Sequence, residues 1–178
     1  MYHHPDFSQY LIHLKKRKPD SAAHSNPALK FTDKSAKERL IGILETKQII
    51  ATKLTTGNSA NACCLTECVW GSLLDHARRY SSYGIGFTKE FIYRQKGNPV
   101  FYVAPELFDT YKKDNVLLPY LALYDLQHRK HIDFTHEREW RIPETLKFTL
   151  KDVAFIIVKS YADSLDFDKY IKRNGYKI

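Results

Sequence analysis

The chain has 178 residues, of which 43% are hydrophobic and 13% aromatic, and its net charge at pH 7 is +8. A chain of this length can bury a hydrophobic core within one domain. No apolar run is long enough to span a bilayer and the N-terminus has no signal-peptide core, so no membrane partner is expected. The excess of positive charge favours a polyanionic partner such as a nucleic acid, or a phosphate-bearing ligand.

The three cysteines, Cys63, Cys64 and Cys68, lie within six residues of one another. An odd, clustered set of thiols is not the pattern of a secreted disulfide framework, and it indicates a reducing compartment, the cytoplasm. A zinc site would require paired ligand spacing and further ligands elsewhere. We therefore expect buried thiols and no metal site.

Residues 1–28 are polar and basic and contain three of the seven prolines, which predicts an N-terminal extension ahead of a single domain at 29–178. Within this extension, the spacing of its apolar residues predicts a short amphipathic helix over 8–18. The apolar-polar alternation of residues 29–32 predicts the first strand of the domain.

The residues from Ser35 to Lys47 predict a helix with a side-chain cap at its N-terminus. Ser35 and Glu38 have the spacing of a capping box, and the helix is expected to end near Lys47. Its apolar stripe consists of Leu40, Ile43 and Leu44. A short strand is expected at 48–51.

Residues 53–62 are rich in Thr, Asn, Ser and Gly and predict a flexible loop. The apolar run at 62–66 predicts a strand, and the helical spacing of the apolar residues in 69–80 predicts a helix. Between them, Glu67 is expected in a loop with its carboxylate facing water, or in the wall of a polar pocket. In residues 83–87, Tyr-Gly-Ile-Gly-Phe, the glycines permit close backbone approach.

The remaining chain predicts more short elements. Strands are expected at 100–103 and 153–158, the second as an interior strand. Helices are expected at 90–93 and 165–173, and residues 105–113 and 117–128 are expected to be helical or partly so. Short strands and helices without a regular strand-helix-strand alternation predict an α+β fold, with a small mixed or antiparallel split sheet and flanking helices.

The stretch Phe134–Pro143 concentrates two carboxylates, two guanidiniums, a histidine and an indole. If it is extended, Glu137, Glu139 and Arg141 share one face. Like charges at this spacing raise the free-energy cost of ionising each other when they are buried. An exposed, salt-bridged edge strand is one interpretation; a pocket with a chemical task is the other, and Trp140 favours partial burial. Nearby His136 is expected at the surface.

Several motifs together resemble the bacterial AbiGi-type abortive-infection family over residues 28–160. These motifs are Lys30-Phe31-Thr32-Asp33, the helix end at 43–49, Cys64-Leu65-Thr66-Glu67-Cys68, Tyr83–Phe87, Asn98–Tyr102 and His136–Arg141.

The same layout resembles, more distantly, the ADP-ribosyltransferase fold of DarT-like toxins. That resemblance implies NAD as cofactor, Glu139 as the catalytic glutamate, Glu137 as its acceptor-side partner and Tyr83 against the nicotinamide. It places Lys30, Phe31 and Thr32 at the first strand, near the adenosine-side ribose. His or Arg is usual in those toxins where this chain has Lys30.

The chemistry of that reaction explains why these residue types would be needed. Cleavage of the nicotinamide–ribose bond develops positive charge, which a carboxylate on the neighbouring 2′-hydroxyl stabilises selectively in the transition state. Phe87 could stack on the nicotinamide, and Arg141 or Lys30 could neutralise the pyrophosphate. The alternative is that Tyr83 and Phe87 pack the core beside the glycines.

Two functions are therefore expected from the sequence. The first is an NAD-dependent ADP-ribosyltransferase toxin that modifies a nucleic-acid or protein acceptor in phage defence or in a toxin–antitoxin system. The second is a non-catalytic antitoxin or regulatory module that binds RNA or a toxin partner. A metal-dependent nuclease would need acidic residues brought together from distant segments.

Overall fold

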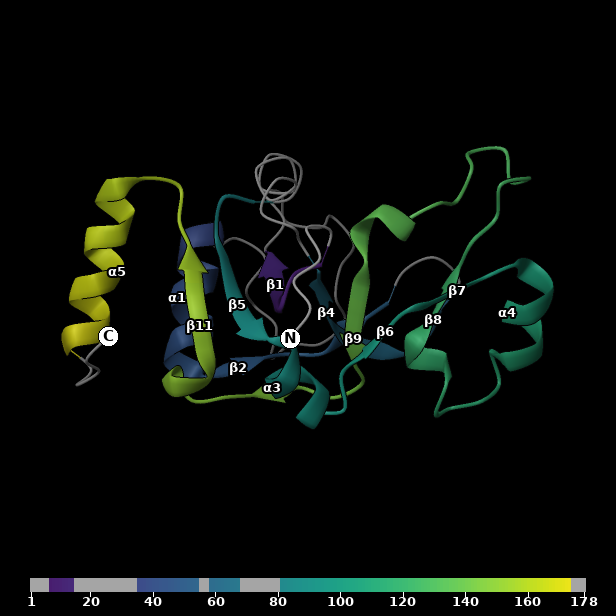
Figure 1. Cartoon of the computed structure of the whole chain (residues 1–178), viewed down its shortest axis with the longest axis horizontal. Coiled ribbons are helices and arrows are strands. Elements are labelled where there is room, and N and C mark those ends of the chain that lie inside the picture. The colour runs from purple at the N-terminus through teal and green to yellow at the C-terminus, as the bar shows by residue number, and fades with distance from the viewer. Residues whose placement is uncertain (1–6, 15–34, 55–57, 68–80, 174–178) are drawn as a thin grey trace.

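The computed structural model describes residues 7–14, 35–54, 58–67 and 81–173 (Figure 1). A seven-stranded antiparallel sheet lies at the centre, in the order β11-β5-β1-β4-β9-β6, with β3 paired to β4. Its strands are β1 (Tyr10–Leu14), β3 (Thr52–Lys53), β4 (Asn61–Thr66), β5 (Gly84–Thr88), β6 (Asn98–Pro99), β9 (Glu139–Ile142) and β11 (Val153–Ile157).

The other elements surround this sheet. Two small sheets pair β2 (Gln48–Ile49) with β10 (Leu146–Lys147), antiparallel, and β7 (Phe101–Val103) with β8 (Leu121–Leu123), parallel. The α-helices are α1 (Ala36–Thr46), α3 (Lys89–Arg94), α4 (Pro105–Tyr111) and α5 (Tyr161–Arg173), and the 3-10 helices are η2 (Leu118–Tyr120), η3 (Thr135–Glu137) and η4 (Leu150–Asp152). The predicted α+β class, with an antiparallel sheet and flanking helices, is confirmed.

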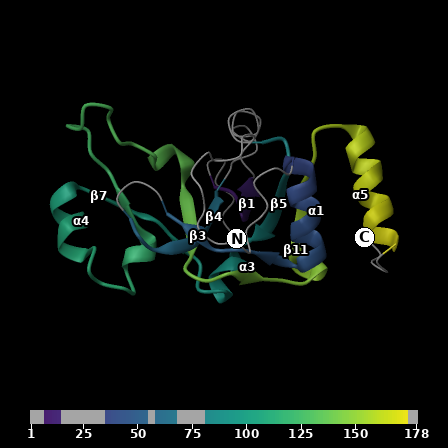
Figure 2. The same ribbon diagram turned by 180° about the vertical axis from the view of Figure 1, so that it is seen from behind.

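Helix α1 forms as the sequence predicts. Ser35 accepts a hydrogen bond from the Glu38 amide while the Glu38 carboxylate accepts one from the Ser35 amide, and the three residues of the predicted stripe are buried. The helix lies behind β11 and β5 in Figure 1 and in front of them in Figure 2, so it covers one face of the sheet.

The core lies between that face and the helices, and it combines Leu and Ile side chains with a group of phenylalanines. Phe87 of β5 is fully buried, and its ring centroid is 5.5 Å from that of Phe91 on α3 and 5.1 Å from that of Phe148. Helix α5 adds Phe167, and α1 adds its stripe. Phe87 therefore packs the core, which is the second of the two interpretations open from the sequence.

The opposite face of the sheet, which we call the polar face, carries polar residues beside apolar ones such as Ile12 and Phe155. Ile12 pairs with Thr66 and with Gly86, and Thr66 pairs with Glu139, so all four share this face. A Cβ on Gly86 would collide with the ring of Phe155, which packs directly on the glycine. The glycines of 83–87 thus permit close packing, as predicted.

The helix predicted over 8–18 is wrong where it can be seen, because residues 10–14 form β1. This strand lies in the middle of the sheet, paired with β4 on one side and β5 on the other. Leu11 and Ile12 point to opposite faces and both are buried. A strand buried on both faces has a continuous apolar run without alternation, which a helix can also produce.

Three further segments differ from prediction. Residues 117–128, expected to be helical or partly so, are helical only in η2, and the chain then forms β8, which pairs with β7. Strand β11 lies at the edge of the sheet and is only partly buried, although its composition predicts an interior strand. The predicted loop over 53–62 contains the ends of β3 and β4, and its Asn58 is buried.

Residues 101–134 form an arm at one end of the molecule (Figures 1 and 2). The arm contains β7, α4, η2 and β8, and none of its residues belongs to the main core cluster. It has a small core of its own, formed by Phe108, Leu118 and Leu121. The arm is thus a separate packing unit attached to the sheet at β9.

Some sequence predictions lie outside the described residues. They are the strand at 29–32 with Lys30, Phe31 and Thr32, the helix at 69–80, the thiol of Cys68 and the boundary between residues 28 and 29.

Candidate functional site

The segment containing Glu137 and Glu139 is not one continuous strand. Asp133 accepts hydrogen bonds from the amide and the hydroxyl of Thr135, and helix η3 begins there. Arg138 then adopts a left-handed conformation with φ 42°, and β9 begins at Glu139. The prediction that Glu137 and Glu139 share one strand face is therefore wrong.

The two carboxylates nevertheless line the same small pocket on the polar face of the sheet. Its volume is about 90 Å³, and its other lining residues are Ile12, Leu14, Cys64, Leu65 and Thr66. Thr66 fixes Glu137 by donating its hydroxyl to the Glu137 carbonyl. Small-molecule sites usually begin at about 300 Å³, so this pocket is smaller than a dinucleotide site. NAD as cofactor stays a prediction.

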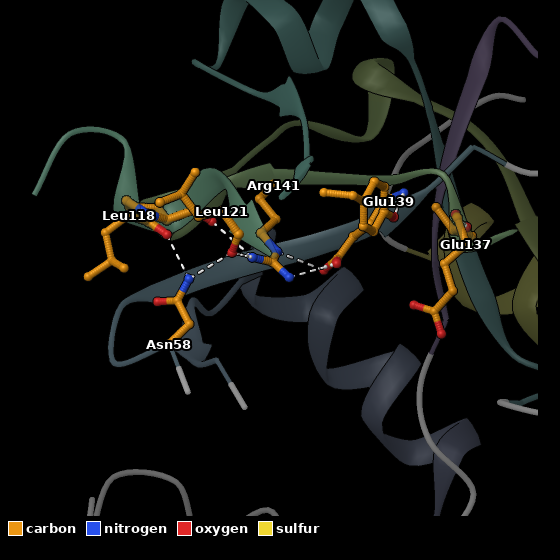
Figure 3. A network of polar contacts seen from close by, with 9 residues as sticks. Asn58, Leu118, Leu121, Glu137, Glu139 and Arg141 are labelled. Atoms are coloured by element: carbon orange, nitrogen blue, oxygen red, sulfur yellow. Dashed lines mark hydrogen bonds and ion pairs between the residues drawn. The ribbon is translucent and has the colours of Figure 1, made fainter. Parts of the chain in front are cut away.

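Glu139 is held by Arg141, its neighbour on the same strand face (Figure 3). Arg141 Nε donates to Glu139 Oε1 at 2.9 Å and Nη2 donates to Oε2 at 2.8 Å. The exposed fractions of the two side chains are 8% for Arg141 and 13% for Glu139. Both carboxylate oxygens are thus engaged in a bidentate, largely desolvated ion pair.

The third nitrogen of Arg141 connects this pair to the arm. Nη1 donates to the Leu121 carbonyl at 2.8 Å and to the Pro119 carbonyl at 3.3 Å. Asn58 Nδ2 donates to the same Leu121 carbonyl at 2.9 Å and to the Leu118 carbonyl at 2.7 Å. We call Glu139, Arg141 and Asn58, with these carbonyls, the polar hub (Figure 3).

The polar hub also alters the acidity of neighbouring groups. Burial, reinforced by the Glu139 carboxylate, raises the pKa of the Cys64 thiol well above its ordinary value. Burial likewise raises the pKa of Tyr102, whose phenol oxygen accepts a hydrogen bond from the Glu139 amide. Cys64 and Tyr102 therefore stay protonated at neutral pH, and a protonated thiol is a poor nucleophile.

Burial alone would lower the pKa of Arg141, but the hydrogen bonds and charge of Glu139 outweigh it and raise that pKa. The guanidinium stays charged, and its donors are used within the protein. The arrangement is therefore suited to fixing β9, the 58–60 segment and the arm in one geometry.

Tyr83 lies away from the glutamates. Its hydroxyl donates to Asp163 Oδ2 at 3.1 Å, and Lys37 Nζ lies 2.7 Å from Asp163 Oδ1, so Asp163 of α5 holds both Tyr83 and Lys37 of α1. Three strand spacings, about 14 Å, separate β5 from β9. Of the residues predicted for the site, the structure brings Glu137, Glu139 and Arg141 together and leaves Tyr83 and Phe87 elsewhere. Their roles toward a ligand stay predictions.

Glu67 is buried, so the prediction that its carboxylate faces water is wrong. Its Oε1 accepts from the Ser8 amide at 3.2 Å and lies 2.8 Å from Lys89 Nζ. Lys89 Nζ in turn lies over the ring of Trp140 at 5.7 Å from its centroid. Glu67 therefore anchors the start of β1 to α3. His136 is exposed, as predicted.

No group of three metal-ligating side chains lies within the part of the chain that the structure describes. None of the described helices is long and apolar enough to cross a membrane.

Comparison with known proteins gives one match. A family model described as "Putative abortive phage resistance protein AbiGi, antitoxin" matches residues 29–132. No curated protein and no solved structure matches the chain. The matched segment contains Asn58 and the whole of the arm up to residue 132, and it ends before Glu137, Glu139 and Arg141.

Proposed function

This chain belongs to the AbiGi family, whose model matches more than half of it, and from that premise we propose that it is an antitoxin that binds and restrains a toxin protein. The observation that carries the proposal is the family description, which names an antitoxin in abortive phage resistance. The binding of a toxin is the activity that this description implies.

The same match corrects the first of the two functions expected from the sequence. The prediction of an ADP-ribosyltransferase toxin is wrong, because the family description names an antitoxin. The resemblance to the ADP-ribosyltransferase fold has no support among solved structures. The second expectation, a non-catalytic module with a toxin partner, agrees with the family description.

The polar hub supports a binding role without turnover. Arg141 donates from Nε and Nη2 to the two oxygens of Glu139 and from Nη1 to backbone carbonyls of the arm. A general base or nucleophile needs a free, reactive lone pair within reach of a substrate. The hydrogen bonds of Glu139 and Arg141 instead keep the arm in place on β9.

A titration tests the proposal. The protein encoded by the gene adjacent to that of this chain is taken as the candidate toxin and mixed with increasing amounts of the purified chain, and toxin activity and complex formation are measured together. We expect full neutralisation at a stoichiometric ratio, with a stable complex on size-exclusion chromatography. Neutralisation at a small fraction of the toxin concentration would indicate catalysis, and an absence of any complex at micromolar concentrations would contradict the proposal.

A further inference from the structure

The arm exposes more large hydrophobic side chains than the rest of the molecule. It holds 34 of the 131 described residues but six of the eleven exposed large hydrophobic side chains. These six are Phe101, Leu107, Tyr111, Val116, Leu126 and Phe134. Scattered exposed apolar residues are ordinary, whereas a concentration of them in one small unit indicates an interaction surface.

Helix α4 presents apolar side chains on two sides. Phe108 is buried on the inner side, where α4 packs against β8. Leu107 and Tyr111 are one helical turn apart on the outer side, with exposed fractions of 51% and 46%. Val116, which follows the helix, is 76% exposed. We call Leu107, Tyr111 and Val116 the α4 patch.

The charge of the arm distinguishes a protein partner from a nucleic acid. The arm has four Lys and Arg against five Asp and Glu, whereas the other 144 residues have 24 against 15. Binding to phosphates depends on an excess of Lys and Arg, which the arm lacks. Its neutral, apolar surface is therefore suited to another protein.

The ionic contacts of the arm indicate which charged groups its partner should carry. Asp109 pairs with Lys112 at 2.7 Å, and Asp114 accepts from the amides of Val116 and Leu117. Two charged residues beside the α4 patch, Glu106 and Lys113, form no ion pair with any residue in the described ranges. A basic group and a carboxylate at the rim of a docked protein would complement these two residues.

The polar hub contributes to such a surface because it fixes the arm before binding. Arg141 and Asn58 hold the carbonyls at both ends of η2, which connects the loop after α4 to β8. A preorganised surface loses less conformational entropy on association than a mobile one.

We propose that the α4 patch, flanked by Glu106 and Lys113, is the surface on which the toxin docks, and that the toxin contributes an apolar surface with charges of both signs at its rim. This inference rests on the proposed antitoxin function. It lies within the segment that the AbiGi family model covers.

Binding measurements on the whole chain test the inference. The probe is the purified candidate toxin of the titration above, and calorimetry gives the Kd of the wild-type protein, the Leu107→Ser/Tyr111→Ser double variant and Val116→Ser. We expect the double variant to raise Kd by about 30-fold or more, because apolar anchors dominate interface energies. The matched control is Tyr93→Ser/Tyr161→Ser, which removes two rings that are 68% and 79% exposed on the body and is expected to leave Kd unchanged.

Two further measurements complete the test. Lys113→Glu is expected to slow association and to weaken its salt dependence, since a rim charge acts mainly on the association rate. The thermal midpoint of each variant should stay at the wild-type value, because exposed positions contribute little to folding. If the double variant unfolds, Val116→Ser, in the loop after the helix, still reports on the patch.

The outcomes separate this inference from the proposed function. If the wild-type chain does not bind the toxin, the antitoxin function fails and the inference fails with it. If the wild-type chain binds and the α4-patch variants bind equally well, only the inference is overturned. A single-stranded RNA 20-mer is titrated in parallel, and RNA binding that the α4-patch variants abolish would also overturn it.

Discussion

The body of the molecule and its arm are held together by different forces. The body packs Phe87, Phe91 and Phe148 between the sheet and its helices. The arm has only a small apolar core, and the polar hub attaches it to β9. Hydrophobic burial is non-directional, whereas hydrogen bonds fix distances and angles. The body therefore supplies most of the stability, and the hub sets where the arm points.

The largest expected effect comes from the core of the body. Phe87→Ala removes a fully buried ring and leaves a cavity, which should lower the free energy of unfolding by about 3–5 kcal/mol. Urea unfolding followed by circular dichroism measures this loss. Tyr93→Ala removes an exposed ring as control and should change stability by less than about 0.5 kcal/mol. Equal losses in both variants would contradict the assignment of the core.

The next effect concerns the attachment of the arm. Arg141→Leu leaves the Glu139 carboxylate buried without its partner and should cost about 3 kcal/mol. Hydrogen exchange should show that amides of the arm lose protection before those of β5. The double variant Glu139→Leu/Arg141→Leu should recover part of the loss. If it is less stable than Arg141→Leu alone, the ion pair is not the cause.

Asn58→Ala should have a smaller, local effect. It removes the donor to the carbonyls of Leu118 and Leu121 and should cost about 1–3 kcal/mol. Asn61→Ala, an exposed neighbour on β4, is the matched control. Hydrogen exchange should rise in η2 and β8 for Asn58→Ala alone. An increase in hydrogen exchange that is uniform across the body would contradict a local role for Asn58.

The smallest effect depends on pH. Hydrogen bonds from Lys37 and Ser160 lower the pKa of Asp163 to about 2, below the ordinary value of about 3.9. The stabilisation by this carboxylate is therefore complete above about pH 4 and is lost as the pH falls toward 2. Asp163→Asn should flatten the fall in stability across that interval. Asp168→Asn, on the same helix, is the control and should leave the dependence of unfolding free energy on pH as in the wild type. If Asp163→Asn also keeps the wild-type dependence, Asp163 is not its source.

The sequence predicts those parts of the fold that consecutive residues determine. The capping box and the apolar stripe of α1 are local sequence patterns, and local patterns also predict β4, α3 and α4. Tertiary context decides the rest. Strand β1 is buried on both faces, which removes the alternation that identifies a strand.

The polar hub is predictable only in part. Glu139 and Arg141 are two residues apart in a strand, so their shared face follows from the sequence. The left-handed conformation of Arg138 separates Glu137 from them, and no composition rule indicates it. Asn58 is far away in sequence, and its side-chain hydrogen bonds go to backbone groups. A polar residue in a Gly- and Ser-rich segment gives no signal that its amide is buried.

The central position of β1 has a consequence for the order in which the protein can fold. Tyr10 pairs with Thr88, and Ile12 with Thr66. Strand β1 is synthesised before both of its partners, so its two edges stay unpaired until residue 88 has been made and β1 is inserted between β4 and β5. Pairings this distant in sequence form slowly. Unpaired edges attract strands of other chains during that interval, so the rate of insertion should govern how much newly made protein escapes aggregation.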